Sequence, residues 1–228
     1  MTIHLPDARV GTIAAVFATM VTGCVGPEIE LVERFLTASQ RGDNETVALL
    51  SMVSFPAEVE SWNVLELTRA RREPYRVPEL RGKVAAAEHE RDAQLEAFGE
   101  FRQHNYETLR RINERLRHDP EYHFPGQIGE LQDQWEMFRL ERKQAAAKLR
   151  DAEAAFELEL RRVHKSLERE EVPEELSGEL IRKDARVRVT TPDGDSHYVL
   201  ALSRYELSNQ FKALVPARWI ITAVAVAD

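Results

Sequence analysis

Few side chains in this sequence have the types and spacing that acid–base chemistry needs. A general acid or base is a titratable group held in a cleft with a shifted pKa, and His197 and Glu66 are the two candidates near aromatic residues. The alternation along their predicted strands does not clearly turn either side chain inward. The sequence also lacks a glycine-rich phosphate loop and the GxSxG and HExxH motifs. We therefore expect a protein that is not an enzyme and that needs no cofactor.

A second group of polar side chains has the types that bind metals. His118, Asp119, Glu121 and His123 all lie in the segment HDPEYHFPG. Metal sites usually place such ligands at regular spacing on a rigid element, for example two histidines four residues apart on a helix. A short segment rich in Pro and Gly is instead typical of a turn, so we predict a turn and no metal.

The same turn carries two aromatic residues, Tyr122 and Phe124. Aromatic side chains exposed at such a place are typical of a surface that contacts a partner protein. The alternative is that they pack over the ends of the neighbouring helices. The sequence leaves both interpretations open.

A further set of aromatic residues is a candidate lining for an apolar pocket between a sheet and the first helix. Its members are Phe35, Trp62, Tyr198, Tyr205 and Trp219. Aromatic walls with a few polar groups are typical of small-ligand sites. These residues equally suit an ordinary hydrophobic core, which is the interpretation we favour.

The chain has one cysteine, Cys24, which excludes an intramolecular disulfide and a zinc site built on several cysteines. It follows an apolar run over residues 10–23. That run is shorter than the roughly 20 apolar residues that span a bilayer, but it fits the apolar region of a secretory signal. The alternative is a buried structural cysteine at the end of an apolar element.

The residues Val21-Thr22-Gly23-Cys24 resemble the lipobox of bacterial lipoproteins. The resemblance implies that residues 1–23 are a signal peptide, and that the thiol of Cys24 and the new amino group are acylated, with palmitate as a typical chain. More than one acyl chain gives a stable membrane anchor. The resemblance also implies a bacterial cell envelope protein that faces the periplasm, on the outer membrane in a cell with two membranes, because Val25 rather than Asp follows the cysteine.

The elements that position these residues fall into three groups. Pro27 starts a helix that Gly42 ends, and a second short helix runs to Leu50. Residues 59–69 predict a strand. Near the other end, strands are predicted over residues 185–191, 196–205 and 218–227, with Asp193-Gly194 as a hairpin turn.

Between these groups, residues 78–171 predict two long helices, over about 78–117 and from Pro125 to Pro173, each roughly 60 Å long. Apolar residues of the second helix recur at alternating spacings of three and four, which is typical of a coiled coil. The positions of this repeat are Ile128, Leu131, Trp135, Phe138, Arg142, Ala145, Leu149, Ala152, Phe156, Glu159 and Val163. The first helix has a less regular seam of Val84, Leu95, Phe98, Leu109, Ile112 and Leu116.

Together these elements predict an α+β fold, in which an antiparallel coiled-coil hairpin (78–171) interrupts a small domain with a four-strand antiparallel sheet (24–77 and 172–228). The stretches EIELVERFLTASQRGDNETVALLS, HYVLALSRYE and ARWIITAVAVAD resemble the nuclear transport factor 2-like fold, as found in small bacterial lipoproteins. That resemblance covers residues 27–69 and 184–228. It implies a curved sheet with an apolar pocket, in which some members carry out isomerase or cyclase chemistry.

The net charge of the chain indicates which class of partner it can bind. The chain has 31 Lys and Arg against 39 Asp and Glu, a net charge of −8, and this balance disfavours binding to nucleic acid. We expect a non-enzymatic interaction or scaffolding module that contacts a protein partner or a second copy through its hairpin. The alternative is a module that binds a small-molecule ligand in the apolar pocket.

Overall fold

The computed structural model describes residues 26–169 and 175–227. The described residues form five helices and a six-stranded antiparallel sheet, which confirms the predicted α+β class. The helices are α1 (Pro27–Arg41), α2 (Asn44–Leu50), α3 (Val77–His104), α4 (Tyr106–His118) and α5 (Gln127–Leu167). The strands are β1 (Ser61–Leu67), β2 (Arg71–Pro74), β3 (Ser177–Thr191), β4 (Gly194–Ser208), β5 (Leu214–Val215) and β6 (Ile220–Val226).

A long hairpin of β3 and β4 forms the centre of the sheet. β3 ends at Thr191 and β4 begins at Gly194, so the hairpin turns where the Asp193-Gly194 motif predicts it. β1 and β2 pair with successive parts of β3, while β6 and β5 pair with successive parts of β4. The predicted number of four strands is therefore wrong. β2 and β5 are too short to show a period of two, and β2 is largely charged (RREP).

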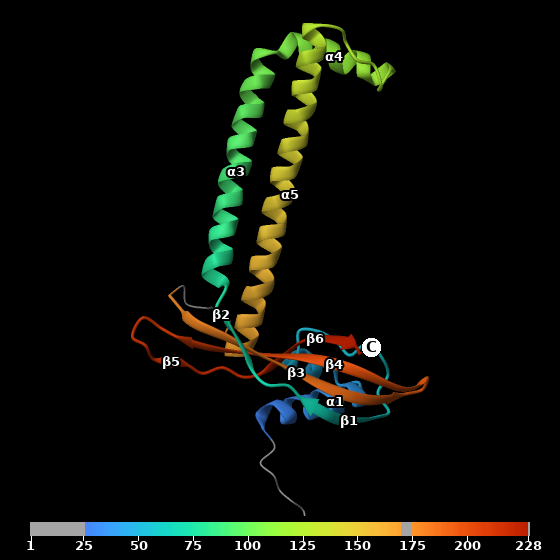
Figure 1. Cartoon of the computed structure of the whole chain (residues 1–228), viewed down its shortest axis with the longest axis vertical. Coiled ribbons are helices and arrows are strands. Elements are labelled where there is room, and N and C mark those ends of the chain that lie inside the picture. The colour runs from blue at the N-terminus through green and yellow to red at the C-terminus, as the bar shows by residue number, and fades with distance from the viewer. Residues whose placement is uncertain (1–25, 170–174, 228) are drawn as a thin grey trace, which may run out of the picture.

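The two faces of the sheet carry different cores, because successive side chains of a strand point to opposite faces. One core lies under α1 and α2, and its sheet residues are Ile181, Ala185, Val187 and Val189 of β3 with Tyr198, Leu200 and Leu202 of β4. The other lies under the C-terminal end of α5 and includes Leu180, Tyr205 and Leu207. In Figure 1, α1 accordingly lies on one side of the sheet and the long helices rise from the other.

Local sequence explains how α1 and α2 begin and end. Pro27 occupies the first turn of α1, and Gly42 ends the helix with a positive φ of 68°. Asp43 then caps α2, since its carboxylate accepts a hydrogen bond from the backbone N–H of Thr46 at 3.0 Å. The buried stripe of α1 is Leu31, Val32, Phe35, Leu36 and Ala38.

The helices α3 and α5 run antiparallel, side by side, and form a stalk (Figure 1). With 41 residues, α5 is about 60 Å long. The side of α3 that packs on α5 has regular spacings of three and four, and its residues are Leu80, Val84, Ala87, Arg91, Gln94, Phe98 and Phe101. Leu95, which we placed in this seam, is 45% exposed. Because Arg91 and Gln94 are polar, the pattern of apolar residues alone does not identify the side of α3 that packs on α5.

On α5, most of the predicted repeat faces inward. Buried members include Trp135, Ala145, Leu149 and Val163, and the buried polar residue Glu159 is one of them. Arg142 is exposed instead, and its guanidinium lies over the ring of Phe98, 4.4 Å from the ring centroid. That the two helices form a coiled coil stays a prediction.

The first arm of the hairpin is not the single helix that we predicted. It breaks at Asn105, and α4 turns aside at the far end of the stalk (Figure 1). The side-chain amide of Asn105 donates a hydrogen bond to the carbonyl of Phe101 at 2.9 Å, which is the local competition that makes Asn unfavourable inside helices. Leu109 and Ile112 of α4 pack with Trp135 in the core of the tip.

Candidate functional site

The structure divides the five predicted pocket residues between the two faces of the sheet. Phe35 of α1 and Tyr198 of β4 are buried between that helix and the sheet, where both contact Phe55 at ring-centroid distances of 6.4 and 4.7 Å. Trp62 and Trp219 belong to the same core. Tyr205 lies on the opposite face. These side chains are therefore not brought together around one space, and they pack as parts of two cores.

The two acid–base candidates are exposed. His197 lies on β4 with its side chain in solvent. Glu66 on β1 pairs with Arg186 at 3.6 Å, and both side chains are more than half exposed. A catalytic group needs a sheltered position where its pKa is tuned, and neither residue has one.

A buried polar network lies at the root of the stalk, in a place the sequence did not indicate. The hydroxyl of Tyr205 donates to Oε1 of Glu159 at 2.8 Å, and the guanidinium of Arg162 pairs with Oε2 at 3.2 Å. Burial, together with the adjacent charge of Glu159, raises the pKa of Tyr205. Glu159 is only 3% exposed, so these two partners supply hydrogen bonds that water cannot. The network joins α5 to β4.

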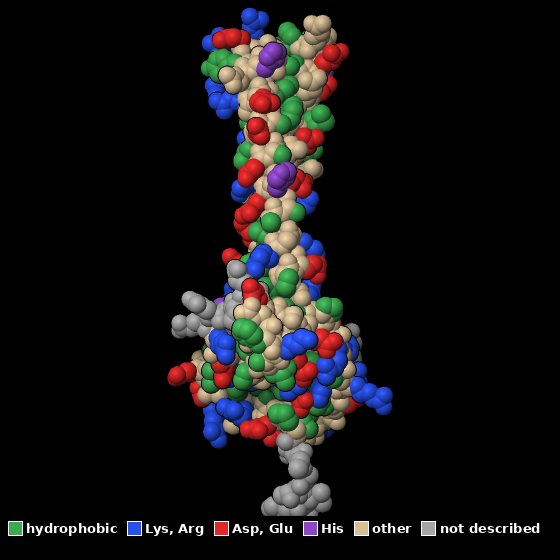
Figure 2. Space-filling view, turned by 90° about the vertical axis from the view of Figure 1, so that its left-hand side faces the viewer, with side chains coloured by type: hydrophobic (Ala, Val, Ile, Leu, Met, Phe, Trp, Pro, Cys, Tyr) green, Lys and Arg blue, Asp and Glu red, His purple; other side chains and the backbone are tan. Residues whose placement is uncertain are grey.

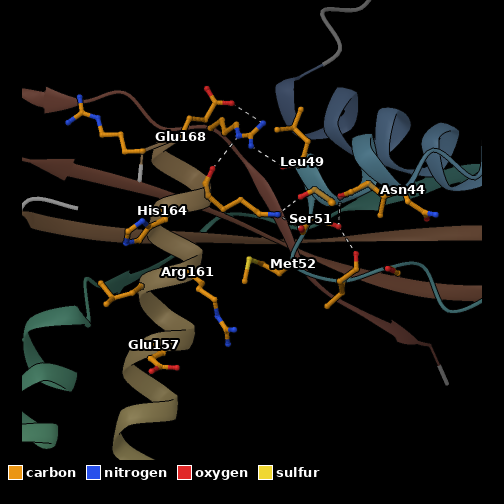
Figure 3. Close-up of a pocket in the computed structure, with 16 residues that line it drawn as sticks. Asn44, Leu49, Ser51, Met52, Glu157, Arg161, His164 and Glu168 are labelled. Atoms are coloured by element: carbon orange, nitrogen blue, oxygen red, sulfur yellow. Dashed lines mark hydrogen bonds and ion pairs between the residues drawn. The ribbon is translucent and has the colours of Figure 1, made fainter. Parts of the chain in front are cut away.

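An open groove with a volume of about 1160 Å³ lies between α2 and the root of α5 (Figure 3). Its exposed surface is mostly apolar, and its apolar side chains include Val47, Leu49, Met52, Val53 and Leu160. The two sides come from segments that are more than 100 residues apart in the sequence. No local sequence motif marks the groove. The one indication of it is that Leu49, an apolar residue, is exposed.

Two cations hold the walls of this groove together. Lys165 donates to the carbonyls of Ala48 and Ser51, the latter at 2.6 Å. Arg218 donates to the carbonyl of Leu49 at 2.9 Å and pairs with Glu168 at 3.0 Å. Cations at the C-terminal end of a helix satisfy its free carbonyls and its negative dipole end. Burial, and then the charge of Arg218, lowers the pKa of Lys165.

Two cationic side chains that line the groove, Arg161 and Arg169, form no ion pair with any described residue. Arg161 extends toward the space between the two walls, whereas the ring of His164 lies on the other side of α5 (Figure 3). A groove with an apolar surface and cations that no described acid neutralises has the chemistry to hold a small apolar molecule with an acidic group.

At the tip of the stalk, Tyr122 and Phe124 pack edge to face with ring centroids 4.8 Å apart. The guanidinium of Arg115 lies 4.3 Å from the centroid of the Tyr122 ring. Gln132 fixes the loop, since its amide donates to the Tyr122 carbonyl and accepts from the Phe124 N–H at 2.9 and 3.1 Å. Both rings are half-buried. They thus pack over the ends of the helices, and contact with a partner stays a prediction.

The polar residues of this turn are spread out. His123 lies 3.8 Å from the carboxylate of Asp133 on α5, and His118 ends α4. Within residues 26–169 and 175–227, no three His, Cys, Asp or Glu residues gather as they would around a metal ion.

No protein-family model, no curated protein and no solved structure matches this chain. In the part of the chain that the structure describes, no helix is both long and apolar enough to cross a membrane. The predicted signal peptide (1–23) and Cys24 lie outside the described residues.

Proposed function

We propose that this chain is a lipid-anchored protein of the bacterial cell envelope, whose stalk presents a recognition surface to a protein partner. In this proposal Cys24 carries the anchor, on the outer membrane where there are two membranes, and the chain faces the periplasm. The protein acts by position and contact and is not an enzyme.

The arrangement of α1 and the stalk on opposite faces of the sheet carries this proposal. α1 begins at Pro27, close in sequence to Cys24, and packs on one face. The root of α5 packs on the other face through Val163 and Leu167. An anchor beside α1 would therefore direct the stalk away from the membrane, with its tip roughly 60 Å beyond the sheet.

Rigidity at the root supports the same function. Besides the Tyr205–Glu159 hydrogen bond, the hydroxyl of Ser166 donates to the carbonyl of Arg218 at 2.8 Å. The backbone N–H of Arg218 donates to the carbonyl of Ser166, also at 2.8 Å. A helix fixed by buried contacts holds its far end at a defined place, as presentation to a partner requires.

We also propose two finer features of the fold. The three-and-four spacing on both α3 and α5 supports an antiparallel coiled coil. Two N-terminal helices against an antiparallel sheet support a nuclear transport factor 2-like base, made of residues 24–77 and 172–228 and interrupted by the hairpin.

Cross-linking in native membranes tests the proposed function. The full chain is compared with a tipless variant, in which residues 102–131 are replaced by a short Gly/Ser turn so that the root of the stalk is kept. We expect cross-linked protein partners of the full chain to be lost from the variant. An unchanged set of partners, with circular dichroism showing a folded variant, would refute recognition through the tip.

A second candidate function has its own observation. The groove between α2 and α5 has a volume of about 1160 Å³ and mainly apolar walls, which supports binding of a small apolar acid. Binding of a fluorescent fatty acid, reduced by Arg161→Glu, would support this function. Equal binding of the fatty acid by the parent protein and by the Arg161→Glu variant would exclude a role for Arg161.

A further inference from the structure

One side of the upper stalk forms a continuous face. Leu95, Gly99 and Arg102 follow one another at spacings of four and three, which places them on the same side of α3, and Tyr106 follows as the first residue of α4. Three shallow hollows with volumes of about 560, 410 and 330 Å³ follow these residues. The two hollows nearer the tip share Arg102 and Tyr106. We refer to the residues that line the three hollows as the upper stalk face.

This face is strongly cationic, although the chain as a whole has a charge of −8. Its only acidic residues are Glu114 and Glu136 among the described residues that line the hollows. Its basic residues are Arg91, Arg102, Arg110, Arg117, Arg139, Arg142 and Lys143. Figure 2 shows both signs of charge along the stalk.

Five of these cations form no ion pair with any residue that the structure describes: Arg102, Arg117, Arg139, Arg142 and Lys143. Elsewhere on the stalk, exposed bases do have acidic neighbours, as in the pairs Lys83–Glu79 and Lys148–Glu90. The upper stalk face therefore has cationic charge that no described residue neutralises.

Exposed apolar side chains lie among these cations. Leu95 is 45% exposed, Leu140 55% and Tyr106 54%. Trp135 lines the hollow nearest the tip, and its buried indole N–H has no hydrogen-bond acceptor. A surface with apolar anchors and unpaired charge of one sign is typical of one that binds an amphipathic helix of the opposite charge.

We propose that the upper stalk face binds an acidic amphipathic helix of a protein partner. This inference rests on the proposed function and names the chemistry of the partner. The apolar stripe of such a helix would cover Leu95, Leu140 and Tyr106, while its carboxylates would pair with Arg102 and Arg139. A second copy is a poor occupant, because a two-fold contact through this face would set its cations against one another.

A pair of synthetic peptides tests this proposal on the full chain in detergent. Both are amphipathic helices with leucines at the a and d positions, one with glutamates and the other with lysines at the remaining positions, and both carry a fluorophore. Fluorescence anisotropy measures their binding at low and at physiological salt. We expect the glutamate peptide to bind, with an affinity that falls as salt rises, and the lysine peptide not to bind.

The double variant Arg102→Glu/Arg139→Glu should weaken binding of the glutamate peptide at least about tenfold. Arg34→Glu/Arg150→Glu makes the same change in net charge on α1 and the lower stalk, and should leave the affinity unchanged. Equal binding of both peptides, or an equal loss in both variants, overturns the proposal. Tighter binding of duplex DNA or of anionic phospholipid vesicles, lost in the Arg102/Arg139 variant, assigns the face to another polyanion and overturns it too.

Cross-linking separates failure of this inference from failure of the proposed function. If partners are lost on removal of the tip but retained by the Arg102→Glu/Arg139→Glu variant, recognition occurs elsewhere on the tip and only the inference fails. If partners persist both without the tip and in the Arg102→Glu/Arg139→Glu variant, the proposed function itself fails.

Discussion

At the scale of single residues, charged pairs between elements hold the helices to the sheet. Lys183 of β3 pairs with Glu28 at the start of α1 at 2.6 Å, and the side chains are 21% and 12% exposed. Burial alone would raise the pKa of Glu28, but the hydrogen bond and charge of Lys183 lower it below the usual 4.5. This pair fixes the end of α1 that lies nearest the proposed anchor.

Replacing Lys183 by Met should therefore change how stability depends on pH. A carboxylate with a lowered pKa stabilises the folded state above its unfolded pKa, and this contribution is lost as pH falls. We expect Lys183→Met to lower the free energy of unfolding by about 1 kcal/mol at pH 7, with a smaller difference at pH 3. Urea unfolding at the two pH values measures this. Lys83→Met, which breaks an exposed pair within α3, is the control and should have little effect on stability. If the stability loss of Lys183→Met were the same at both pH values, the pair with Glu28 would not be its cause.

Tyr205 gives a second prediction at this scale. Its hydroxyl is a hydrogen-bond donor to the buried Glu159, and Tyr205→Phe leaves one carboxylate oxygen without that donor. We expect the free energy of unfolding to fall by about 2 kcal/mol, the usual cost of an unsatisfied buried group. Chemical denaturation measures it.

Tyr75→Phe is the matched control for this substitution. The rings of Tyr75 and Tyr205 are 6.2 Å apart in the same core, and burial raises the pKa of Tyr75 to about 12. Removal of its hydroxyl should have a smaller effect at neutral pH. Equal losses in the two variants would show that packing, and not the Glu159 hydrogen bond, matters at this site.

At the scale of elements, one glycine decides whether α5 can begin beside the tip loop. A Cβ atom at Gly129 would lie 2.1 Å from the backbone carbonyl oxygen of Phe124, a distance that forces the loop to move. We expect Gly129→Ala to displace the tip loop and change the near-ultraviolet circular dichroism of Trp135 and its neighbours. The core of the sheet should stay intact.

Gly99→Ala on α3 is the control, because nothing lies within 4 Å of the position that a Cβ atom would take there. Alanine is the better helix former by about 1 kcal/mol, so this variant should be slightly more stable than the parent. A Gly129→Ala protein with an unchanged spectrum and stability would show that the loop is free to adjust.

The elements also show what the sequence could and could not predict. Capping residues and apolar periodicity locate α1, α2 and the β3–β4 hairpin, because these signals are local. β2 and the break at Asn105 were missed, since a four-residue charged strand is specified by its pairing with β3, and one Asn weakly opposes a strong helical pattern. The seam of α3 was misassigned at Leu95 because polar residues fill part of the true seam.

The candidate sites were less predictable than the elements. Tyr198 and Tyr205 looked alike in sequence, but strand parity along β4 puts them on opposite faces of the sheet. The groove between α2 and α5 joins segments distant in the chain, so only the tertiary fold reveals it. The upper stalk face needs the α3–α4 break, which brings Tyr106 and Arg117 to one hollow.

At the scale of the whole molecule, the proposed anchor makes a direct prediction. Cys24→Ser removes the thiol that would take the diacylglyceryl group, so metabolic labelling with palmitate should be lost and the protein should leave the membrane fraction. The stalk and the sheet are built from residues after Cys24 and should fold as before. Retained labelling in the serine variant would refute acylation at this residue, and Lys83→Met serves as a control that keeps the label.

The last prediction concerns the stalk as a spacer of defined length and register. Deleting residues 84–90 and 149–155 removes one heptad from each arm, outside the upper stalk face, and keeps the Phe98 and Phe156 positions in phase with their neighbours. We expect this double deletion to fold cooperatively and to shorten the stalk by roughly 10 Å, which small-angle X-ray scattering measures. Deletion from one arm alone should unfold the stalk, because the two arms then no longer match in length. If binding of the glutamate peptide survives the double deletion while cross-linking in membranes is lost, then the stalk sets the distance at which the tip reaches its partner. If cross-linking also survives, recognition depends on the tip alone and the length of the stalk is not part of the function.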